Sequence, residues 1–169
     1  MSKPTEFVCT KCRRKYPSDE DRRLCTECHS PLLLAHNLDE ISNKIVRDSF
    51  EDRGWSVWRY LELLPPITEE KVISLGEGGT ALLQCDRLAR VMGLKKLHVK
   101  DETTNPTGSF LDRGMTIDVS RANGLGFRSV RCQAASGNFA ASASAYSSRA
   151  GFKCFIHLPR KRVERLDLG

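Results

Sequence analysis

Two C-x-x-C pairs near the start of the sequence constrain the fold of this chain more than any other feature. Cys9 and Cys12 form the first pair, Cys25 and Cys28 form the second, and twelve residues separate the pairs. Two tight turns of this kind can bring four thiolates together around one zinc ion. The intervening RRKYPSDEDRRL is polar and has little with which to build a core. We therefore expect a zinc-ribbon module over residues 1–36 that folds with its metal; the alternative is four unligated thiols.

The three other cysteines and the distribution of apolar residues indicate the cellular compartment of the protein. Cys85, Cys132 and Cys154 occur singly among apolar residues, as small buried side chains do. The first residues, MSKPTEFVCT, lack the apolar segment of a signal peptide, and no apolar run approaches the ~18 residues of a membrane helix. We therefore expect a cytoplasmic protein without membrane contact, whose seven cysteines do not form a disulfide framework.

The charge balance is basic, with a formal net charge of +6 and a pI of about 9.0. A basic surface can contact nucleic acid or a phosphate-bearing ligand, but the same charges can simply solvate an exposed face. The candidate surface combines the C-terminal RKRVER with Arg128, Arg131, Lys153 and Arg160. Basic residues without a base-reading element would give RNA binding no sequence specificity.

Residues 37–93 are expected to form a connector. Residues 37–54 have helical periodicity, and the aromatic WSVWRYLELLPP that follows is typical of a docking segment ended by its prolines. SLGEGGT then predicts a glycine turn, and residues 81–92 predict an amphipathic helix that ends at Gly93. A glycine turn before a helix can offer backbone N–H groups to a phosphate or carboxylate.

Residues 94–169 alternate strand and helix patterns. We predict strands at residues 97–100, 127–136 and 152–159, with helices over 109–123 and 136–151 between them. This order predicts an α/β domain in three layers, with a small parallel sheet. The loops DETTNPTGS and AASGN follow the first two strands. Because ligands bind at the carboxyl ends of parallel strands, both loops are expected to face one crevice.

At this point the sequence resembles the threonine synthase family of pyridoxal-phosphate enzymes, in the tryptophan-synthase-β (fold-type II) group. The matching stretches, in order, are WRYLELLP, SLGEGGT, VKDETTNPTGSF, DRG and ASGNFAASASAYSSRAG. The resemblance implies a protein that converts O-phosphohomoserine to threonine and releases phosphate. It also implies that Asn138, Ser109 and Asp112 match positions at the cofactor, and that Ser136 and Gly137 match the loop around the substrate carboxylate.

Two departures from the family pattern weaken the expectation of catalysis. The family has a lysine after the phenylalanine of SF-x-DR, where it forms the Schiff base with pyridoxal phosphate, and this chain has Leu111. Leucine has no amine to react. The segments that hold the cofactor phosphate and ring nitrogen in the family would follow Gly169. We therefore expect a truncated, non-catalytic homologue in which pyridoxal phosphate does not bind covalently.

Three other interpretations stay open. The chain could be one piece of a split threonine synthase, which would be credible only with a lysine at position 111. It could be a zinc-containing basic protein that binds RNA or another protein. It could also associate with a homologue, or with itself, through apolar surface that the family's larger domain would cover.

Overall fold

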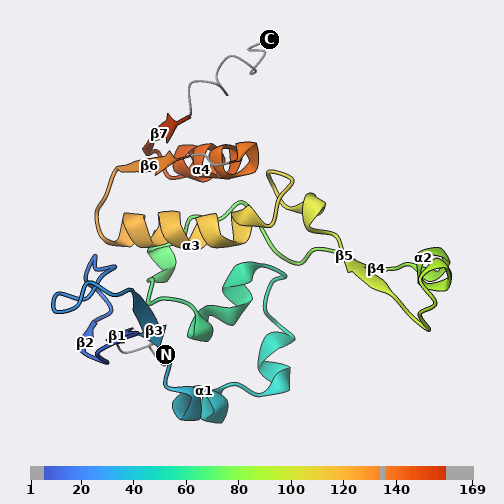
Figure 1. The fold of residues 1–169 in the computed structure, drawn as a ribbon, viewed down its shortest axis with the longest axis horizontal. Helices are drawn as coiled ribbons and strands as arrows, with labels where there is room; N and C mark the ends of the chain where they lie inside the picture. Colours follow the sequence, from blue (N-terminus) through green and yellow to red (C-terminus); the bar gives the residue numbers. More distant parts are fainter. Residues whose placement is uncertain (1–5, 134–135, 159–169) are drawn as a thin grey trace.

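The computed structural model describes residues 6–133 and 136–158. Within these ranges, no helix has both the length and the apolar character needed to cross a bilayer. The predicted basic segment RKRVER, with Arg160, lies outside the described residues. Figure 1 shows a helical and sheet-containing body from which one thin unit projects to the side.

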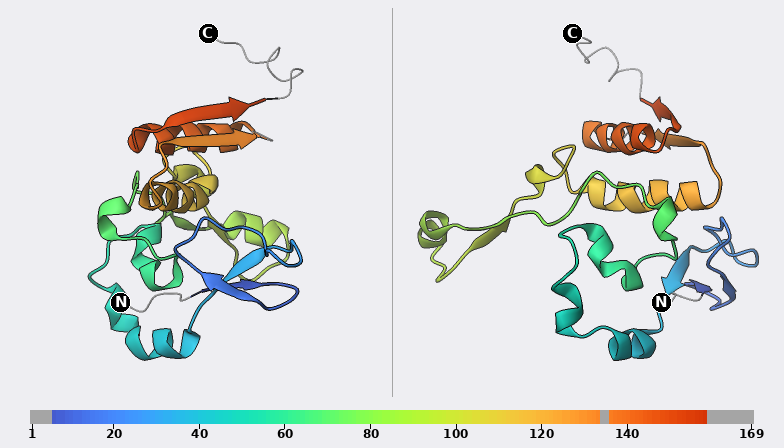
Figure 2. Two further views of the ribbon diagram at one scale, coloured as in Figure 1. Left: turned by 90° about the vertical axis from the view of Figure 1, so that its left-hand side faces the viewer. Right: turned by 180° about the vertical axis from the view of Figure 1, so that it is seen from behind.

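The cysteine-rich segment forms a small antiparallel sheet at the N-terminal side of the molecule (Figures 1 and 2). Its strands, in the order β2-β1-β3, are β1 (Glu6–Cys9), β2 (Lys15–Pro17) and β3 (Leu32–Ala35). Phe7 at the centre of β1 lies opposite Tyr16 on one side and Leu34 on the other. The chain between β2 and β3 returns to the end of β1, which places the two cysteine pairs beside each other.

The connector contains short helices, not the single helix expected over 37–54. They are α1 (Leu38–Lys44), η1 (Arg47–Phe50), η2 (Val57–Leu63) and η3 (Glu69–Lys71). Asn37 caps α1 by accepting a hydrogen bond from the Glu40 amide at 3.2 Å, and the chain becomes extended at Ile45. The aromatic segment docks onto the body, because Trp58 donates its indole N–H to Thr116 at 2.9 Å.

The helix predicted over 81–92 is wrong in its first half. Leu82–Gln84 forms strand β4, which pairs antiparallel with β5 (His98–Lys100), and only Asp86–Val91 is helical, as α2. In β4 the backbone groups form hydrogen bonds with β5, whereas in a helix they would form hydrogen bonds within the same segment. Tertiary pairing of this kind overrides a local helical pattern in a short segment.

The predicted three-stranded parallel sheet is also wrong, although the α/β class and its small sheets are confirmed. Only β6 (Ser129–Gln133) and β7 (Lys153–His157) pair in parallel, whereas β5 belongs to a separate sheet with β4. The two predicted helices of this region are confirmed as α3 (Leu111–Gly124) and α4 (Gly137–Arg149). The strand–helix order was right, but β5 takes the nearest partner along the chain.

The core lies between α3, α4 and the β6–β7 pair. It consists of a cluster of buried side chains from these elements and from the residue just before β7: Met115, Val119, Cys132, Ala143, Tyr146 and Phe152. Cys132 is therefore buried as predicted, while Cys85 and Cys154 are only half-buried. The α3–α4 contact positions the N-terminal turn of α3, where the candidate site begins.

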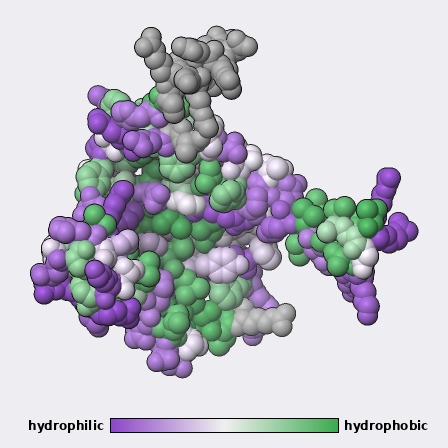
Figure 3. Space-filling model, in the orientation of Figure 1, coloured by the Kyte–Doolittle hydropathy of each residue, from purple (hydrophilic) through white to green (hydrophobic). Residues whose placement is uncertain are grey.

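The projecting unit, residues 82–100, is an arm made of β4, α2 and β5 (Figures 1 and 2). Figure 3 shows apolar surface gathered on it. Its exposed apolar side chains are Leu82, Leu83, Leu88, Val91, Met92, Leu94 and Val99.

Candidate functional site

The four cysteines of the two C-x-x-C pairs lie in one cluster. Their Sγ atoms are all within 4.8 Å of one another. Cys9 Sγ is 3.4 Å from Cys28 Sγ, and Cys12 Sγ is 3.5 Å from Cys25 Sγ. In a tetrahedron with metal–sulfur bonds of ~2.3 Å the sulfurs are roughly 3.8 Å apart, so the spacing fits one tetrahedral ion. The cluster could therefore hold a metal ion.

The two cysteine turns have the same backbone geometry. In the first, the amide of Cys9 donates to Arg14 O at 2.8 Å; in the second, the amide of Cys25 donates to Ser30 O at 2.9 Å. The residue after each second cysteine, Arg13 or His29, has a positive φ of 61° or 52°. This repeated turn is what converts two sequence pairs into one four-sulfur cluster.

Hydrogen-bond donors surround the sulfurs. The amides of Lys11 and Cys12 both donate to Cys9 Sγ at 3.4 Å, and the amide of Glu27 is 3.4 Å from Cys25 Sγ. The Tyr16 hydroxyl lies 3.0 Å from the Cys25 sulfur and lowers the pKa of that thiol to about 6. Donors of this kind stabilise thiolate, which is the form that binds metal.

The cradle loop, residues 101–110 between β5 and α3, is held together by its own hydrogen bonds. Asp101 accepts hydrogen bonds from the amide and hydroxyl of Thr103, at 3.1 and 2.6 Å, and opens the short helix η4 (Glu102–Thr104). Asn105 is buried and donates to both the backbone and the side-chain oxygens of Glu102. Gly108 turns the chain with a φ of 77°. These contacts fold the cradle loop back on itself just before α3 begins.

Leu111 is the first residue of α3 and is half-buried. Ser109, which is buried, accepts a hydrogen bond from the Leu111 amide at 3.3 Å. Phe110, between them, is 62% exposed. Position 111 thus lies at the start of a helix, beside a buried hydroxyl, with a hydrocarbon side chain that can neither transfer a proton nor attack a carbonyl.

Asp112, one of the predicted cofactor-site residues, is fully buried, and its carboxylate is engaged inside the protein. It accepts hydrogen bonds from the amide and hydroxyl of Thr107, at 2.7 and 2.6 Å, and from the hydroxyl of Ser142 at 2.6 Å. Ser142 belongs to α4, so this carboxylate ties the cradle loop to both helices of the body. Three hydrogen-bond donors thus satisfy the oxygens of this buried carboxylate.

The glycine loop and the cradle loop are joined by an ion-pair network. Arg113 donates to both carboxylate oxygens of Glu102, at 2.6 and 2.8 Å, and to the Thr80 hydroxyl at 3.0 Å. The Arg113 guanidinium, with help from Thr80 and Asn105, lowers the pKa of Glu102 to about 2. Asn105 also accepts a hydrogen bond from the Gly78 amide at 3.1 Å. The Glu102 carboxylate therefore stays ionised at neutral pH and holds the two loops together.

The glycines of SLGEGGT serve close packing. A Cβ on Gly79 would lie 2.6 Å from Trp55 O, and one on Gly78 would lie 2.8 Å from the Val57 amide nitrogen. Both glycines also have positive φ, of 60° and 99°. The backbone of the aromatic segment therefore fills the space in front of this turn.

Glu77, between Gly76 and Gly78, is a site residue that sequence reasoning missed. It is fully buried and accepts hydrogen bonds from the Tyr146 hydroxyl at 2.6 Å, the Ser74 hydroxyl at 3.0 Å and the Leu75 amide at 3.0 Å. Burial, followed by the neighbouring Glu77 carboxylate, raises the pKa of Tyr146. An acidic residue in a glycine turn is normally exposed to solvent, so burial was not expected from the sequence. The one available signal was a single carboxylate among the glycines.

The second predicted loop lies at the N-terminus of α4. Ser136 caps this helix by accepting a hydrogen bond from the Phe139 amide at 3.3 Å, and Ser136, Gly137 and Asn138 are all exposed. Among residues 6–133 and 136–158, no hydrogen bond joins them to Ser109 or Asp112. The structure links α3 and α4 through Asp112 and Ser142 instead. The roles of Ser136, Gly137 and Asn138 toward a ligand stay predictions.

The predicted basic surface is only partly placed. Arg131 on β6 and Lys153 on β7 are exposed, and Arg128 donates to Phe127 O at 2.7 Å. The Arg131 guanidinium lies 5.6 Å from the centre of the Phe155 ring on the neighbouring strand. This arrangement provides positive charge at the β6–β7 edge, and RNA contact there stays a prediction.

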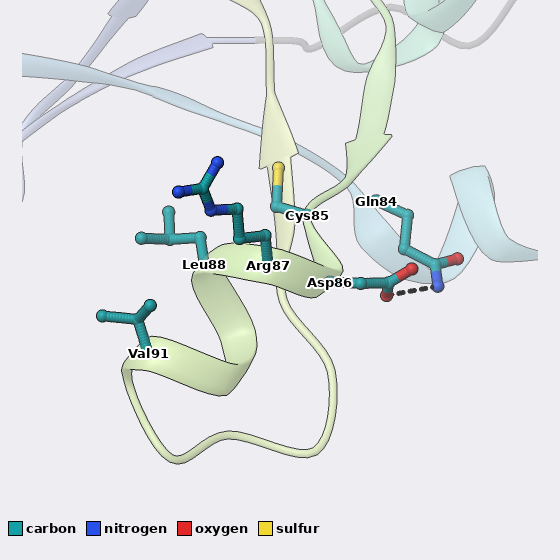
Figure 4. A pocket seen from close by; sticks show the side chains of 6 residues that line it. All are labelled: Gln84, Cys85, Asp86, Arg87, Leu88 and Val91. Carbon is teal, nitrogen blue, oxygen red and sulfur yellow. Dashed lines mark hydrogen bonds between the residues drawn. The ribbon is translucent and has the colours of Figure 1, made fainter.

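Two surface hollows lie away from the cradle loop. One, of about 540 Å³, is on the arm, where Gln84 donates to Asp86 at 2.7 Å and Leu88 and Val91 face outward (Figure 4). The other, of about 340 Å³, is lined by residues 53–62. Neither hollow includes Leu111 or the residues that the sequence placed at a cofactor.

Comparison with known proteins defines the class that the fold and these loops represent. The family model for pyridoxal-phosphate-dependent enzymes matches residues 73–168, and the chain belongs to this family. Among curated proteins it is similar to threonine synthases, which confirms the predicted resemblance. The threonine synthase of Methanocaldococcus jannaschii is 47% identical over 155 residues, which is 92% of this chain and 38% of that protein.

Two further relatives carry the same description. The threonine synthase of Methanosarcina acetivorans is 41% identical over 155 residues, covering 92% of this chain and 37% of its own length. That of Halalkalibacterium halodurans is 42% identical over 113 residues, which is 31% of its length. The chain therefore spans less than two fifths of the curated relatives that it matches.

Proposed function

We propose that this chain is a threonine-synthase-like protein that does not attach pyridoxal phosphate covalently and does not convert O-phosphohomoserine to threonine by itself. The observation that carries the proposal is Leu111 at the first position of α3. When bound, pyridoxal phosphate supplies the electron sink for amino-acid chemistry, and enzymes attach it through a lysine amine. The residues at the start of α3 do not fit that attachment, because position 111 offers no amine.

The neighbouring residues support a structural role for what remains of the cradle. The Asp112 carboxylate is occupied by Thr107 and Ser142, and Glu102 is occupied by Arg113. These contacts hold the loop in shape and leave little charge free for a ligand. We also propose that the four-cysteine cluster holds one zinc ion, supported by the sulfur spacing and the N–H donors around it. The cytoplasm suits this site, because reducing conditions keep its thiols free.

Borohydride trapping tests the absence of covalent attachment. Pyridoxal phosphate is added to the wild-type chain, the mixture is reduced, and peptides are mapped by mass spectrometry. We expect no lysine to be labelled stoichiometrically and no threonine to form from O-phosphohomoserine. The matched variant Leu111→Lys restores an amine at the start of α3 and is expected to gain one pyridoxyl group at that residue. Stoichiometric labelling of a single lysine in the wild-type chain, together with turnover, would show that the proposal is wrong.

A second candidate function rests on the arm. We propose that its apolar surface docks onto a longer threonine-synthase chain, acting there as an interaction module. The matched region is 38% of the Methanocaldococcus jannaschii threonine synthase and 37% of the Methanosarcina acetivorans one, so more than half of each relative lies outside it. Burying exposed apolar surface is worth about 25 cal/mol per Å², so an uncovered arm favours association.

Native mass spectrometry tests this association. Mixing the chain with the Methanocaldococcus jannaschii threonine synthase at micromolar concentration is expected to give a mixed oligomer. Leu83→Glu, on the exposed arm, is expected to abolish it, while the matched change Leu33→Glu on the exposed face of β3 leaves it intact. An unchanged mass profile for the wild-type mixture, or equal binding by both variants, would exclude docking through the arm.

A further inference from the structure

The two-stranded sheet of β6 and β7 has one face on the core and one face open to solvent (Figure 2). Side chains alternate between the two faces along both strands. The inward side chains, which belong to the core or pack against it, are those of Val130, Cys132, Cys154 and Ile156. The outward side chains are all exposed. They pair across the strands in three rungs, which we call the open face: Ser129–Lys153, Arg131–Phe155 and Gln133–His157.

The open face is polar, which is unusual for a parallel sheet. Parallel strands are normally covered on both faces, and their sequences then form continuous apolar runs. In β6 and β7, every outward residue except Phe155 is polar. This face therefore suits water or a charged partner, and a layer of apolar side chains from another domain would be a poor match for it.

Positive charge on the open face is not balanced by neighbouring acids. From Val119 to Leu158 the sequence has five arginine and lysine residues and no aspartate or glutamate. Among the residues that the structure describes, no ion pair joins Arg131 or Lys153 to a carboxylate. Both side chains are exposed, so an anion from outside the protein can reach them.

Phe155 places an aromatic ring on the middle rung of the open face. Its side chain is 45% exposed, and the Arg131 guanidinium lies 5.6 Å from the centre of its ring. A single exposed ring needs no explanation by itself. A ring beside an arginine, with Lys153 one rung away, is a more specific arrangement. Unpaired bases stack on rings and guanidinium groups, while cations neutralise the phosphates of the same strand.

From these observations we propose that the open face binds single-stranded nucleic acid, with a base stacked on Phe155 and phosphates at Arg131 and Lys153. The three rungs span about 13 Å along the strands, so the contact covers a few nucleotides and tolerates any sequence. A duplex hides its base faces in its own stack. An acidic peptide would use the two cations and leave the ring without a role. The site includes neither Leu111 nor the cysteine cluster, so it is independent of the proposed function.

Fluorescence anisotropy of the full chain tests the proposal, with labelled oligouridylate, the matching oligothymidylate and a duplex of the same length as probes. We expect both single strands to bind more tightly than the duplex, and the tighter of the two identifies RNA or DNA as the preferred strand. Phe155→Leu is expected to weaken binding about fivefold or more at unchanged salt dependence, because it removes stacking and no charge. The matched control Phe110→Leu, at a ring that is 62% exposed on the cradle loop, is expected to bind as the wild type does.

Salt dependence separates the phosphate contacts from the stacking. Arg131→Gln and Lys153→Gln each remove one exposed cation, so each is expected to reduce the slope of log affinity against log salt by about 0.7. Arg87→Gln, exposed on α2 of the arm, loses the same charge and is expected to keep the wild-type slope. Duplex binding as tight as single-strand binding, or wild-type affinity in Phe155→Leu, would overturn the proposal. Polyglutamate that binds as tightly as oligouridylate of equal charge would assign the open face to acidic peptides instead.

Discussion

Serine in place of Cys25 is expected to abolish the proposed zinc binding and to unfold the cysteine module, residues 6–35. Cys25 is 1% exposed, and its sulfur lies 3.5 Å from that of Cys12 and 3.0 Å from the Tyr16 hydroxyl. The module has few apolar residues with which to fold otherwise. Structural zinc contributes an apparent 10–16 kcal/mol in small domains at neutral pH, so loss of one ligand removes most of the driving force for folding.

The measurement combines metal analysis with limited proteolysis. The wild-type chain is expected to hold about one zinc per molecule and to resist cleavage between its cysteine pairs, whereas the Cys25→Ser variant loses both properties. Cys85→Ser is the matched control, because Cys85 is a half-buried thiol on the arm and outside the cluster. A metal-free chain whose first 35 residues are fully protected from protease would contradict the zinc proposal.

The second large effect is expected for Asp112→Ala. The substitution leaves the amide and hydroxyl of Thr107 and the hydroxyl of Ser142 without their acceptor in a fully buried position. Each unsatisfied buried donor costs about 1–3 kcal/mol, and relaxation recovers a part of the sum. We therefore expect the free energy of unfolding to fall by about 4 kcal/mol, measured by urea denaturation.

Two controls separate this network from a generic loss of charge. Ser142→Ala removes one of the three donors and is expected to cost about 1 kcal/mol. Asp86→Ala, at an exposed position on the arm, is expected to change stability by about 0.5 kcal/mol or less. If Asp112→Ala were no more destabilising than Asp86→Ala, the buried carboxylate would not organise the two helices.

Local sequence patterns predicted two kinds of element correctly: those whose contacts are close along the chain, and helices with one apolar face. The alanine- and serine-rich SGNFAASASAYSSRAG, closed by Gly151, predicted α4 within two residues at each end. The four cysteines were recognisable as one cluster because C-x-x-C turns impose their own geometry. Chain order suggested a parallel sheet, but order does not record whether β5 pairs with β4 or with β6.

The polar network of the body could not be predicted for a related reason. Glu77 and Tyr146 are 69 positions apart, and Trp58 and Thr116 are 58 apart. Neither pair follows a local periodicity, and a glutamate between glycines resembles an ordinary exposed turn. The sequence therefore identified groups that are reactive by residue type, such as the four cysteines, and missed polar groups that matter because they are buried, such as Glu77.

The projecting arm has a practical consequence for anyone who prepares this protein. The strands β4 and β5 form a two-stranded sheet, so each offers an outer edge to further pairing, and leucines and valines lie beside those edges. Unprotected edges with apolar side chains are templates for intermolecular aggregation. Yield from recombinant expression should therefore fall steeply as the concentration of the isolated chain rises, and co-production with a longer homologue should keep more of it in the supernatant.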